Sequence, residues 1–293
     1  MPVGRDFNAG PMDVGVPESV IHGNVNVMIE LEQLLALMAR LRDPDCGCPW
    51  DRAQTYATIV PHTIEEAYEV ADAIAREDWV ELRAELGDLL FQVVFYAQIA
   101  HEEGRFDFAD VARSIVEKMT HRHPHVFSDA SYANAAEQTA AWERIKSAEK
   151  AGTVEPDASV LDGVPLPLPA LIRAVKLQKK AARVGFDWGA IEPVLAKIEE
   201  EIAEIRHEIA VGAAPERLTD ELGDVLFAVA NLARHLDLDP EGALRGTNAK
   251  FTRRFQRIET WLAEQGRTPA EATLAEMDAL WEQAKVEERL FNH

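Results

Sequence analysis

The stretch from residue 85 to residue 94 reads ELGDLLFQVV, and residues 221 to 230 repeat it as ELGDVLFAVA. The acidic pattern E-E-x-x-E precedes both stretches, at 65–69 and at 200–204. Basic and aromatic positions follow both in the same order, namely Lys118, Arg122, Trp142 and Lys146 in the first half and Lys250, Arg254, Trp281 and Lys285 in the second. Self-similarity in this order indicates two copies of one structural unit.

Both halves show helical periodicity. Apolar residues recur three and four positions apart and sustained two-residue alternation is absent, which predicts an all-α fold. Pro61 is interpreted as a first-turn proline that begins its helix. The expected helices are 28–41, 61–76, 78–101, 108–120 and 136–150 in the first half, and 170–184, 193–211, 215–237, 240–265 and 271–290 in the second.

The length and the breaks in periodicity predict two domains. A chain of 293 residues exceeds the usual size of one domain. Residues 1–27 carry scattered Gly, Pro and Asn and are expected to form a flexible leader. Residues 151–168 are rich in proline and are expected to form a linker. We therefore expect an N-terminal domain at 28–150 and a C-terminal domain at 169–293.

The composition argues against several classes of partner. The chain carries 51 acidic and 30 basic residues, a formal net charge of −21, and such a surface repels polymeric nucleic acid. The most apolar run, 89–100, is too short to span a membrane. Cys46 and Cys48 are too close in sequence for a structural disulfide, and we interpret them as reduced thiols of a cytoplasmic protein.

The acidic patterns predict a cation site in each half. Residues three apart share one face of a helix. Glu69 and Glu85 both lie eight residues from position 77, and Glu66 and Asp88 both lie eleven from it. If a turn at 77 joins two antiparallel helices, these four carboxylates, the N-terminal quartet, meet at the same height. The C-terminal quartet has the same symmetry about the turn at 212–213 and consists of Glu201, Glu204, Glu221 and Asp224.

Four converging carboxylates repel one another unless a cation compensates their charge. Oxygen ligands suit hard divalent ions, and Mg²⁺ is favoured because it is commonly shared with substrate phosphates, with Mn²⁺ as a possible substitute. An E-E-x-x-E run alone is more often a solvated helix face. The mirror spacing in both halves favours the metal sites. Gly87 and Gly223 lie inside the acidic helices and predict a close approach of another group to the backbone.

Basic and aromatic residues near the C-terminal quartet are candidates for nucleotide binding. Lys197 precedes Glu201 by one turn and shares its face, while the corresponding residue of the first half is His62. A cationic turn and a Trp-x-x-x-Lys pair suit a phosphate chain and a stacked base, although salt bridges and core packing are the simpler explanations for each alone. These further candidates are Lys250, Arg253, Arg254, Trp281 and Lys285.

Three motifs together resemble the MazG family of nucleotide pyrophosphohydrolases: the loop Gly47-Cys48-Pro49-Trp50-Asp51 followed by Gln54-Thr55, the E-E-x-x-E helix and the E-L-G-D helix. The similarity spans about 28–290 and is typical of the two-domain tandem form. It implies an all-α NTP pyrophosphatase fold completed in a homodimer, Mg²⁺ held by the E-x-x-E and E-x-x-D acids, and hydrolysis of nucleoside triphosphates (NTPs) to nucleoside monophosphate and pyrophosphate.

The resemblance further implies that the C-terminal copy is the active one. Its working set is then Lys197, Glu201, Glu204, Glu221, Asp224, Lys250, Arg254, Trp281 and Lys285. Glu200, or Glu65 in the first copy, is a candidate proton acceptor for the attacking water. We expect broad-specificity removal of NTPs from the nucleotide pool.

Other functions remain open at this stage. One is an all-α hydrolase restricted to dUTP, dCTP or phosphoribosyl-ATP. A di-iron bundle requires Glu-x-x-His on two helices, and only Glu204 with His207 matches. The third is an acidic helical adaptor that binds partners without catalysis.

Overall fold

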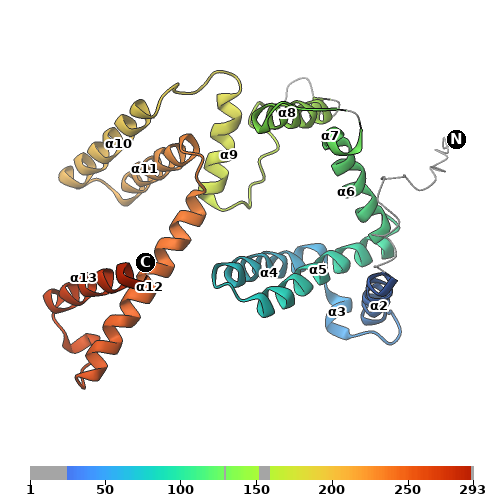
Figure 1. Ribbon diagram of the computed structural model, residues 1–293, viewed down its shortest axis with the longest axis horizontal. Helices are drawn as coiled ribbons and strands as arrows, with labels where there is room; N and C mark the ends of the chain where they lie inside the picture. Colours follow the sequence, from blue (N-terminus) through green and yellow to red (C-terminus); the bar gives the residue numbers. More distant parts are fainter. Residues whose placement is uncertain (1–24, 129, 152–158, 292–293) are drawn as a thin grey trace. The chain divides into compact units, whose positions relative to one another are not determined.

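The computed structural model describes residues 25–128, 130–151 and 159–291. Every regular element in these ranges is helical, which confirms the predicted fold class. The chain divides into two compact units, Met1–Val154 and Glu155–His293 (Figure 1). The proposed leader lies outside the described residues except for 25–27, which belong to the first described helix. Residues 152–158 of the proposed linker also lie outside them.

The first unit is built around an antiparallel pair, α4 and α5 (Figure 1). Glu77 in the connection adopts a left-handed conformation with φ 56°, and Asp78 caps α5 by accepting hydrogen bonds from the amides of Val80 and Glu81. The turn therefore lies where the mirror spacing predicted it. The described helices of this unit are α2 (Val25–Leu41), α3 (Pro49–Ala53), α4 (Tyr56–Ala75), α5 (Trp79–Glu102), α6 (Phe108–Arg122), α7 (Pro124–Phe127) and α8 (Ala135–Ala151).

The core of the first unit joins α2, α4 and α5. It consists of side chains no more than 4% exposed, namely Met38, Ile59, Val94, Phe95 and Ile99. Burial of such side chains contributes about 1.5–3 kcal/mol each. Because this core lies against the C-terminal half of α5, it fixes α4 and α5 side by side while leaving their acidic halves accessible.

The loop between α2 and α4 needs glycine at position 47. The Gly47 and Cys48 amides donate to the carbonyls of Asp43 and Leu41, at 2.9 and 2.7 Å. A Cβ at position 47 would lie 2.5 Å from the Leu41 carbonyl oxygen, a rigid backbone atom. The loop then leads into α3, which carries Trp50 and the buried Asp51.

We expect Gly47→Ala to lower the free energy of unfolding by about 1–3 kcal/mol, because the backbone must shift to accept the methyl group. Chemical denaturation followed by circular dichroism measures this. Gly246→Ala is the matched control: Gly246 lies inside a helix with nothing within 4 Å of the position that its methyl group would take, so alanine there should stabilise by about 0.5–1 kcal/mol. Equal effects at the two positions would contradict this role for the loop.

The second unit repeats the antiparallel pair as α10 and α11, with α9 packed against α11 and α13 beside α12 (Figure 1). Gly212 ends α10 in a left-handed conformation with φ 70°, again at the expected turn. The described helices of this unit are α9 (Ala170–Ala182), α10 (Ile191–Val211), α11 (Pro215–His235), α12 (Pro240–Glu264), the 3-10 helix η1 (Pro269–Glu271) and α13 (Leu274–Phe291).

The structure differs from the sequence-based expectations about the helices in three respects. Pro61 lies inside α4 instead of beginning it, because Thr55 and Thr58 form a capping box that starts the helix at Tyr56. The short helices α3 and α7 were not predicted, since each begins at a proline within a turn-rich stretch. Finally, the close approach of another group predicted at Gly87 and Gly223 is not found among the described residues. Apart from the backbone of the helix itself, no described atom lies within 4 Å of the position that a methyl group would take at either glycine.

Candidate metal and nucleotide site

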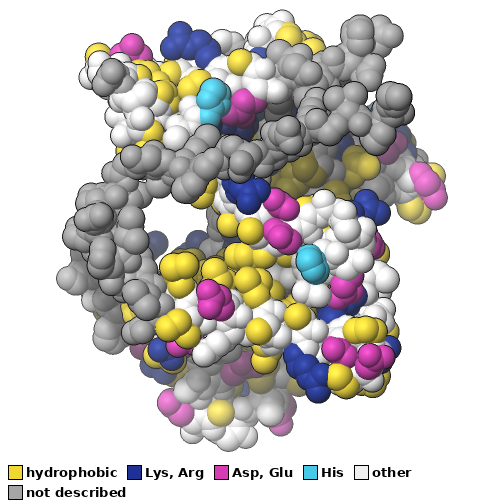
Figure 2. Space-filling model, turned by 90° about the vertical axis from the view of Figure 1, so that its right-hand side faces the viewer, with side chains coloured by type: hydrophobic (Ala, Val, Ile, Leu, Met, Phe, Trp, Pro, Cys, Tyr) yellow, Lys and Arg dark blue, Asp and Glu magenta, His cyan; other side chains and the backbone are white. Residues whose placement is uncertain are grey.

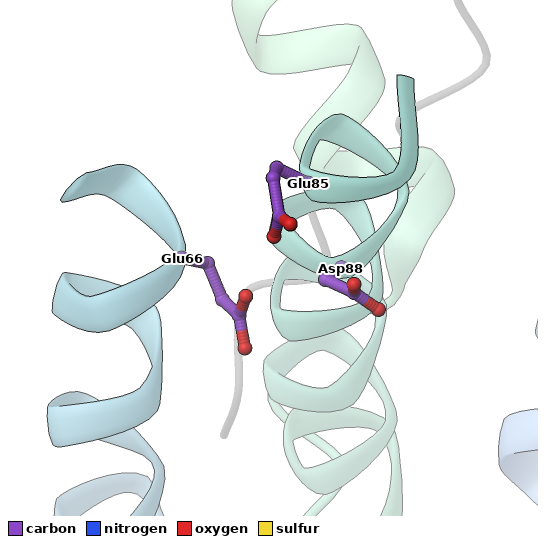
Figure 3. A group of neighbouring side chains, drawn as sticks. All are labelled: Glu66, Glu85 and Asp88. Atoms are coloured by element: carbon purple, nitrogen blue, oxygen red, sulfur yellow. The ribbon is translucent and has the colours of Figure 1, made fainter. Parts of the chain in front are cut away.

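The acids of the N-terminal quartet come together between α4 and α5. Glu66 projects from α4 toward α5, which carries Glu85 and Asp88 (Figure 3). One carboxylate oxygen from each of these three residues lies within 4.8 Å of the others. Glu69, one turn further along α4, does not belong to this trio, but it lies close enough to raise the pKa of Glu66. The predicted convergence thus holds for three acids, with the fourth adjacent.

Burial and the proximity of these acids raise the pKa values of Glu66 and Glu85. Burial, the hydrogen bond to Glu69 and the charges of Asp88, Glu69 and Glu85 raise the pKa of Glu66. Burial and the neighbouring carboxylates, Glu69 first, also raise the pKa of Glu85. Like charges held this close make the deprotonated cluster unfavourable by itself, and a bound cation would relieve that repulsion.

The C-terminal quartet forms a second, more buried cluster. Oxygens of Glu201, Glu204 and Glu221 lie within 4.8 Å of one another. Glu221 is 1% exposed, and its Oε2 has no hydrogen-bond partner among the described residues. Burial is the main cause that raises the pKa of Glu221, and the charges of Glu204 and Asp224 add to it, against the opposing effect of Arg217. A buried carboxylate oxygen without a partner is unfavourable, and a divalent cation would satisfy it.

Two basic side chains reach the C-terminal quartet. Lys197 lies 2.7 Å from Glu201 and 2.8 Å from Glu200, and hydrogen bonds to these two acids raise the pKa of Lys197. Arg217, which the sequence interpretation did not single out, forms an ion pair with Glu221. In the first unit His62 occupies the position of Lys197 and lies 3.7 Å from Glu65.

A cavity of about 680 Å³ opens beside the C-terminal quartet within the second unit. Its wall combines the site residues with exposed aromatic rings and with polar groups near the end of α11. The residues that matter here are Lys197, Glu201, Asp224, Phe186, Trp188 and Asn231. A cavity with an apolar wall and carboxylates at one side suits a ligand that has a flat ring and a phosphate chain.

A polar network fixes the loop that carries Trp188. Asp187 accepts hydrogen bonds from both terminal nitrogens of Arg234 on α11, one of them at 2.9 Å, and lies 3.1 Å from His235. Arg234 also donates to Asn231 at 2.8 Å. The ion pair between Arg234 and Asp187 thus joins the aromatic loop to α11, and Asn231 helps to orient the Arg234 side chain. Sequence reasoning missed Phe186 and Trp188, because the ion pair that joins their loop to α11 links residues 47 apart. It also missed Asn231, although Asn231 follows Asp224 by two turns of α11 and so shares its face.

The first unit holds its aromatic loop in a comparable way. Arg42 forms a bidentate ion pair with Glu102 at the end of α5, with Nε donating to Oε1 and Nη2 to Oε2, and also donates to the backbone carbonyl of Asp51. Trp50 thereby lies with its ring 6.1 Å from that of His62, one turn before Glu66. The second unit has a tryptophan in a similar region, since Trp188 lines the same cavity as Lys197, the residue that corresponds to His62.

The remaining candidates for nucleotide binding lie on α12 and α13 and do not line the cavity. Arg254 donates to Glu288 at 2.8 Å and lies over the Trp281 ring at 5.4 Å. Arg253 also approaches Glu288, at 3.7 Å, and Lys285 pairs with Glu282 at 2.8 Å. Lys250 is half-buried on α12. The structure thus brings Lys197 to the C-terminal quartet but leaves this second group on a separate helix pair.

None of the helices in the described ranges has both the length and the apolar composition that a membrane crossing requires. Cys46 and Cys48 are both free thiols. His207 does not belong to either acidic trio, so the described residues offer no support for the di-iron arrangement.

Comparison with known proteins identifies relatives over nearly the whole chain. A family model described as "MazG nucleotide pyrophosphohydrolase domain" matches residues 54–127 and again 190–258. The nucleoside triphosphate pyrophosphohydrolase of Escherichia coli K12 is 52% identical over 262 residues, which cover 89% of this chain and 99% of that protein. The nucleoside triphosphate pyrophosphohydrolase/pyrophosphatase MazG of Thermotoga maritima is 41% identical over 257 residues, 88% of this chain and 96% of that protein.

Proposed function

Since this chain belongs to the MazG family of nucleotide pyrophosphohydrolases, we propose that it hydrolyses NTPs to nucleoside monophosphate and pyrophosphate, with Mg²⁺ held by its carboxylate quartets. The observation that carries the proposal is the cluster of Glu201, Glu204 and Glu221, in which a buried oxygen has no partner among the described residues, and whose Glu201 also lines an aromatic cavity. It fits a hard divalent cation because all its donors are carboxylate oxygens.

Each acid has a proposed role. Glu201, Glu204, Glu221 and Asp224 hold Mg²⁺ in the C-terminal copy, and Glu66, Glu69, Glu85 and Asp88 do so in the N-terminal copy. When bound, the ion would offset the charge of the triphosphate and orient it for attack by water. Lys197 contributes positive charge near the phosphates. Glu200, exposed and adjacent to Glu201, accepts the proton of the attacking water.

The cavity receives the nucleoside, with its base against Trp188. Trp188→Ala should raise KM about tenfold with little change in kcat, because stacking of a base on an aromatic ring is worth about 1–3 kcal/mol. Steady-state kinetics measures this in a chain whose N-terminal quartet is disabled by Glu66→Gln and Asp88→Asn. Trp188→Phe is the matched control and should keep most of the affinity. An unchanged KM in Trp188→Ala would place the base elsewhere.

A homodimer is part of the proposal. Helices α5 and α11 expose apolar side chains at corresponding positions along one face, each 37–50% exposed: Leu86, Leu90 and Val93 on α5, and Leu222, Leu226 and Val229 on α11. Hydrophobic side chains also gather between charged ones on the face shown in Figure 2. Apolar faces of this kind mark contacts with another chain. A second copy also offers a way to bring Lys250, Arg253, Arg254, Trp281 and Lys285 to a quartet.

Pyrophosphate release from each canonical and damaged NTP, with and without Mg²⁺, tests the proposal. Activity with NTPs of every base supports a cytoplasmic house-cleaning enzyme, that is, one that removes unwanted NTPs from the nucleotide pool. Such broad specificity is expected because an aromatic ring can stack on any base. Turnover of dUTP, dCTP or phosphoribosyl-ATP alone would favour the single-substrate alternative. Absence of pyrophosphate release with all substrates and metals would overturn the proposal.

A further inference from the structure

The two copies differ in charge at the position one helical turn before E-L-G-D. Four residues before Glu221 stands Arg217, and four residues before Glu85 stands Glu81. Residues four apart lie on the same face of a helix, so both side chains are adjacent to their quartet. The flanking sequences align without a gap, WVELRAELGD at 79–88 against PERLTDELGD at 215–224. The same position is therefore basic beside one quartet and acidic beside the other.

Arg217 is engaged with the C-terminal quartet. It forms an ion pair with Glu221 and a second one, at 3.2 Å, with Glu208 on α10, so it connects the two helices that carry the site. The Glu221 side chain is 2% exposed, whereas that of Arg217 is 55% exposed. The exposed guanidinium of Arg217 thus neutralises the buried carboxylate of Glu221. Arg217 also occupies one oxygen of the Glu221 carboxylate, which a metal ion would otherwise use as a ligand.

Glu81 has the opposite effect on the N-terminal quartet. It pairs with Arg76 at 2.8 Å, and Arg76 is shared with Asp72 at 2.7 Å. Among the described residues, neither lysine nor arginine forms an ion pair with Glu66, Glu85 or Asp88. No basic side chain among the described residues is therefore paired with these three acids, and at Glu85 the charge of Glu81 is opposed only by Arg76, which pairs with Glu81 itself.

We propose that Arg217 is a built-in counter-ion that lowers the affinity of the C-terminal quartet for a free divalent cation, whereas the N-terminal quartet, with Glu81 at that position, binds such a cation more tightly. The proposal rests on the metal assignment above. An incoming cation must separate Arg217 from Glu221 or bind beside a fixed positive charge, and both weaken binding. Substrate phosphates would offset this charge, so the C-terminal copy would take up its cation chiefly together with a nucleotide.

Titration of free Mn²⁺, followed by its electron paramagnetic resonance signal, tests the C-terminal copy in the full chain. The N-terminal quartet is first disabled by Glu85→Gln and Asp88→Asn. In this background Arg217→Gln should bind Mn²⁺ about three- to tenfold more tightly, the range expected for an ion pair with one buried partner. Arg206→Gln removes the same charge from an exposed side chain of α10 that has no ion pair with any described residue, and should change affinity by less than about twofold.

The reciprocal change tests the N-terminal copy. With Glu221→Gln and Asp224→Asn in place, Glu81→Arg should weaken Mn²⁺ binding by a similar factor. The Glu81→Arg titration tests the inference even if the Arg217→Gln variant does not fold. Unchanged affinity in Arg217→Gln or in Glu81→Arg, while Mn²⁺ still binds, overturns this inference and leaves the metal assignment intact. Absence of Mn²⁺ binding to both quartets in the parent chain would overturn the metal assignment itself, and this inference with it.

Discussion

Removing the acids of both quartets is expected to abolish pyrophosphate release. A chain that carries Glu201→Gln and Asp224→Asn together with Glu66→Gln and Asp88→Asn should lose about a hundredfold or more in kcat/KM, because neither copy can then hold the ion that neutralises the triphosphate. A coupled pyrophosphate assay on the purified variants measures the loss. The changes preserve side-chain shape, so the loss should occur without unfolding.

The same assay separates the two copies. One variant carries only the C-terminal pair of substitutions and another only the N-terminal pair, and circular dichroism confirms that each remains folded. If the C-terminal copy is the active one, its pair alone should account for most of the loss. Full activity in the chain with all four substitutions would contradict the catalytic role of the quartets.

Chelation is expected to stop turnover altogether. The chain has a formal net charge of −21, and each quartet concentrates four of its carboxylates in one place, so a triphosphate without a cation is repelled. Excess EDTA should bring pyrophosphate release to background, Mg²⁺ should restore it, and Mn²⁺ should substitute at least partly.

A thermal melt of the chelated protein is the control for this experiment. The two units have their own buried helical cores, so the chelated chain should stay folded while inactive. Undiminished pyrophosphate release after exhaustive chelation would mean that the carboxylates act without a metal.

The helical hairpins could be predicted from residue numbers alone. Helices of equal rise that run antiparallel bring residues equidistant from the turn to the same height, which is why the spacing alone predicts that Glu66, Glu85 and Asp88 meet. The turns at Glu77 and Gly212 lie where that symmetry requires. Local periodicity also predicted the helices, with errors where a capping box outweighed Pro61.

The cavity wall could not be predicted in this way. Trp188 lines the cavity beside Glu201 and Asp224, and its neighbour Asp187 pairs with Arg234; no local pattern signals an ion pair across 47 residues. Arg217 was overlooked because a single arginine beside an acid usually indicates a surface salt bridge. Arg254 and Trp281 recur in both halves, yet within one chain they pair with each other and with Glu288, so recurrence alone did not locate them at the cavity.

The central claim is that each carboxylate quartet holds a divalent cation. Crystals of the full chain grown with Mn²⁺ and a non-hydrolysable NTP analogue, measured at the manganese absorption edge, test it directly. The account predicts anomalous peaks within about 2.5 Å of oxygens of the two clusters, Glu201, Glu204 and Glu221 in one copy and Glu66, Glu85 and Asp88 in the other, with the analogue's phosphates on at least the C-terminal ion. Manganese and phosphates bound elsewhere, with both quartets unliganded, would contradict it.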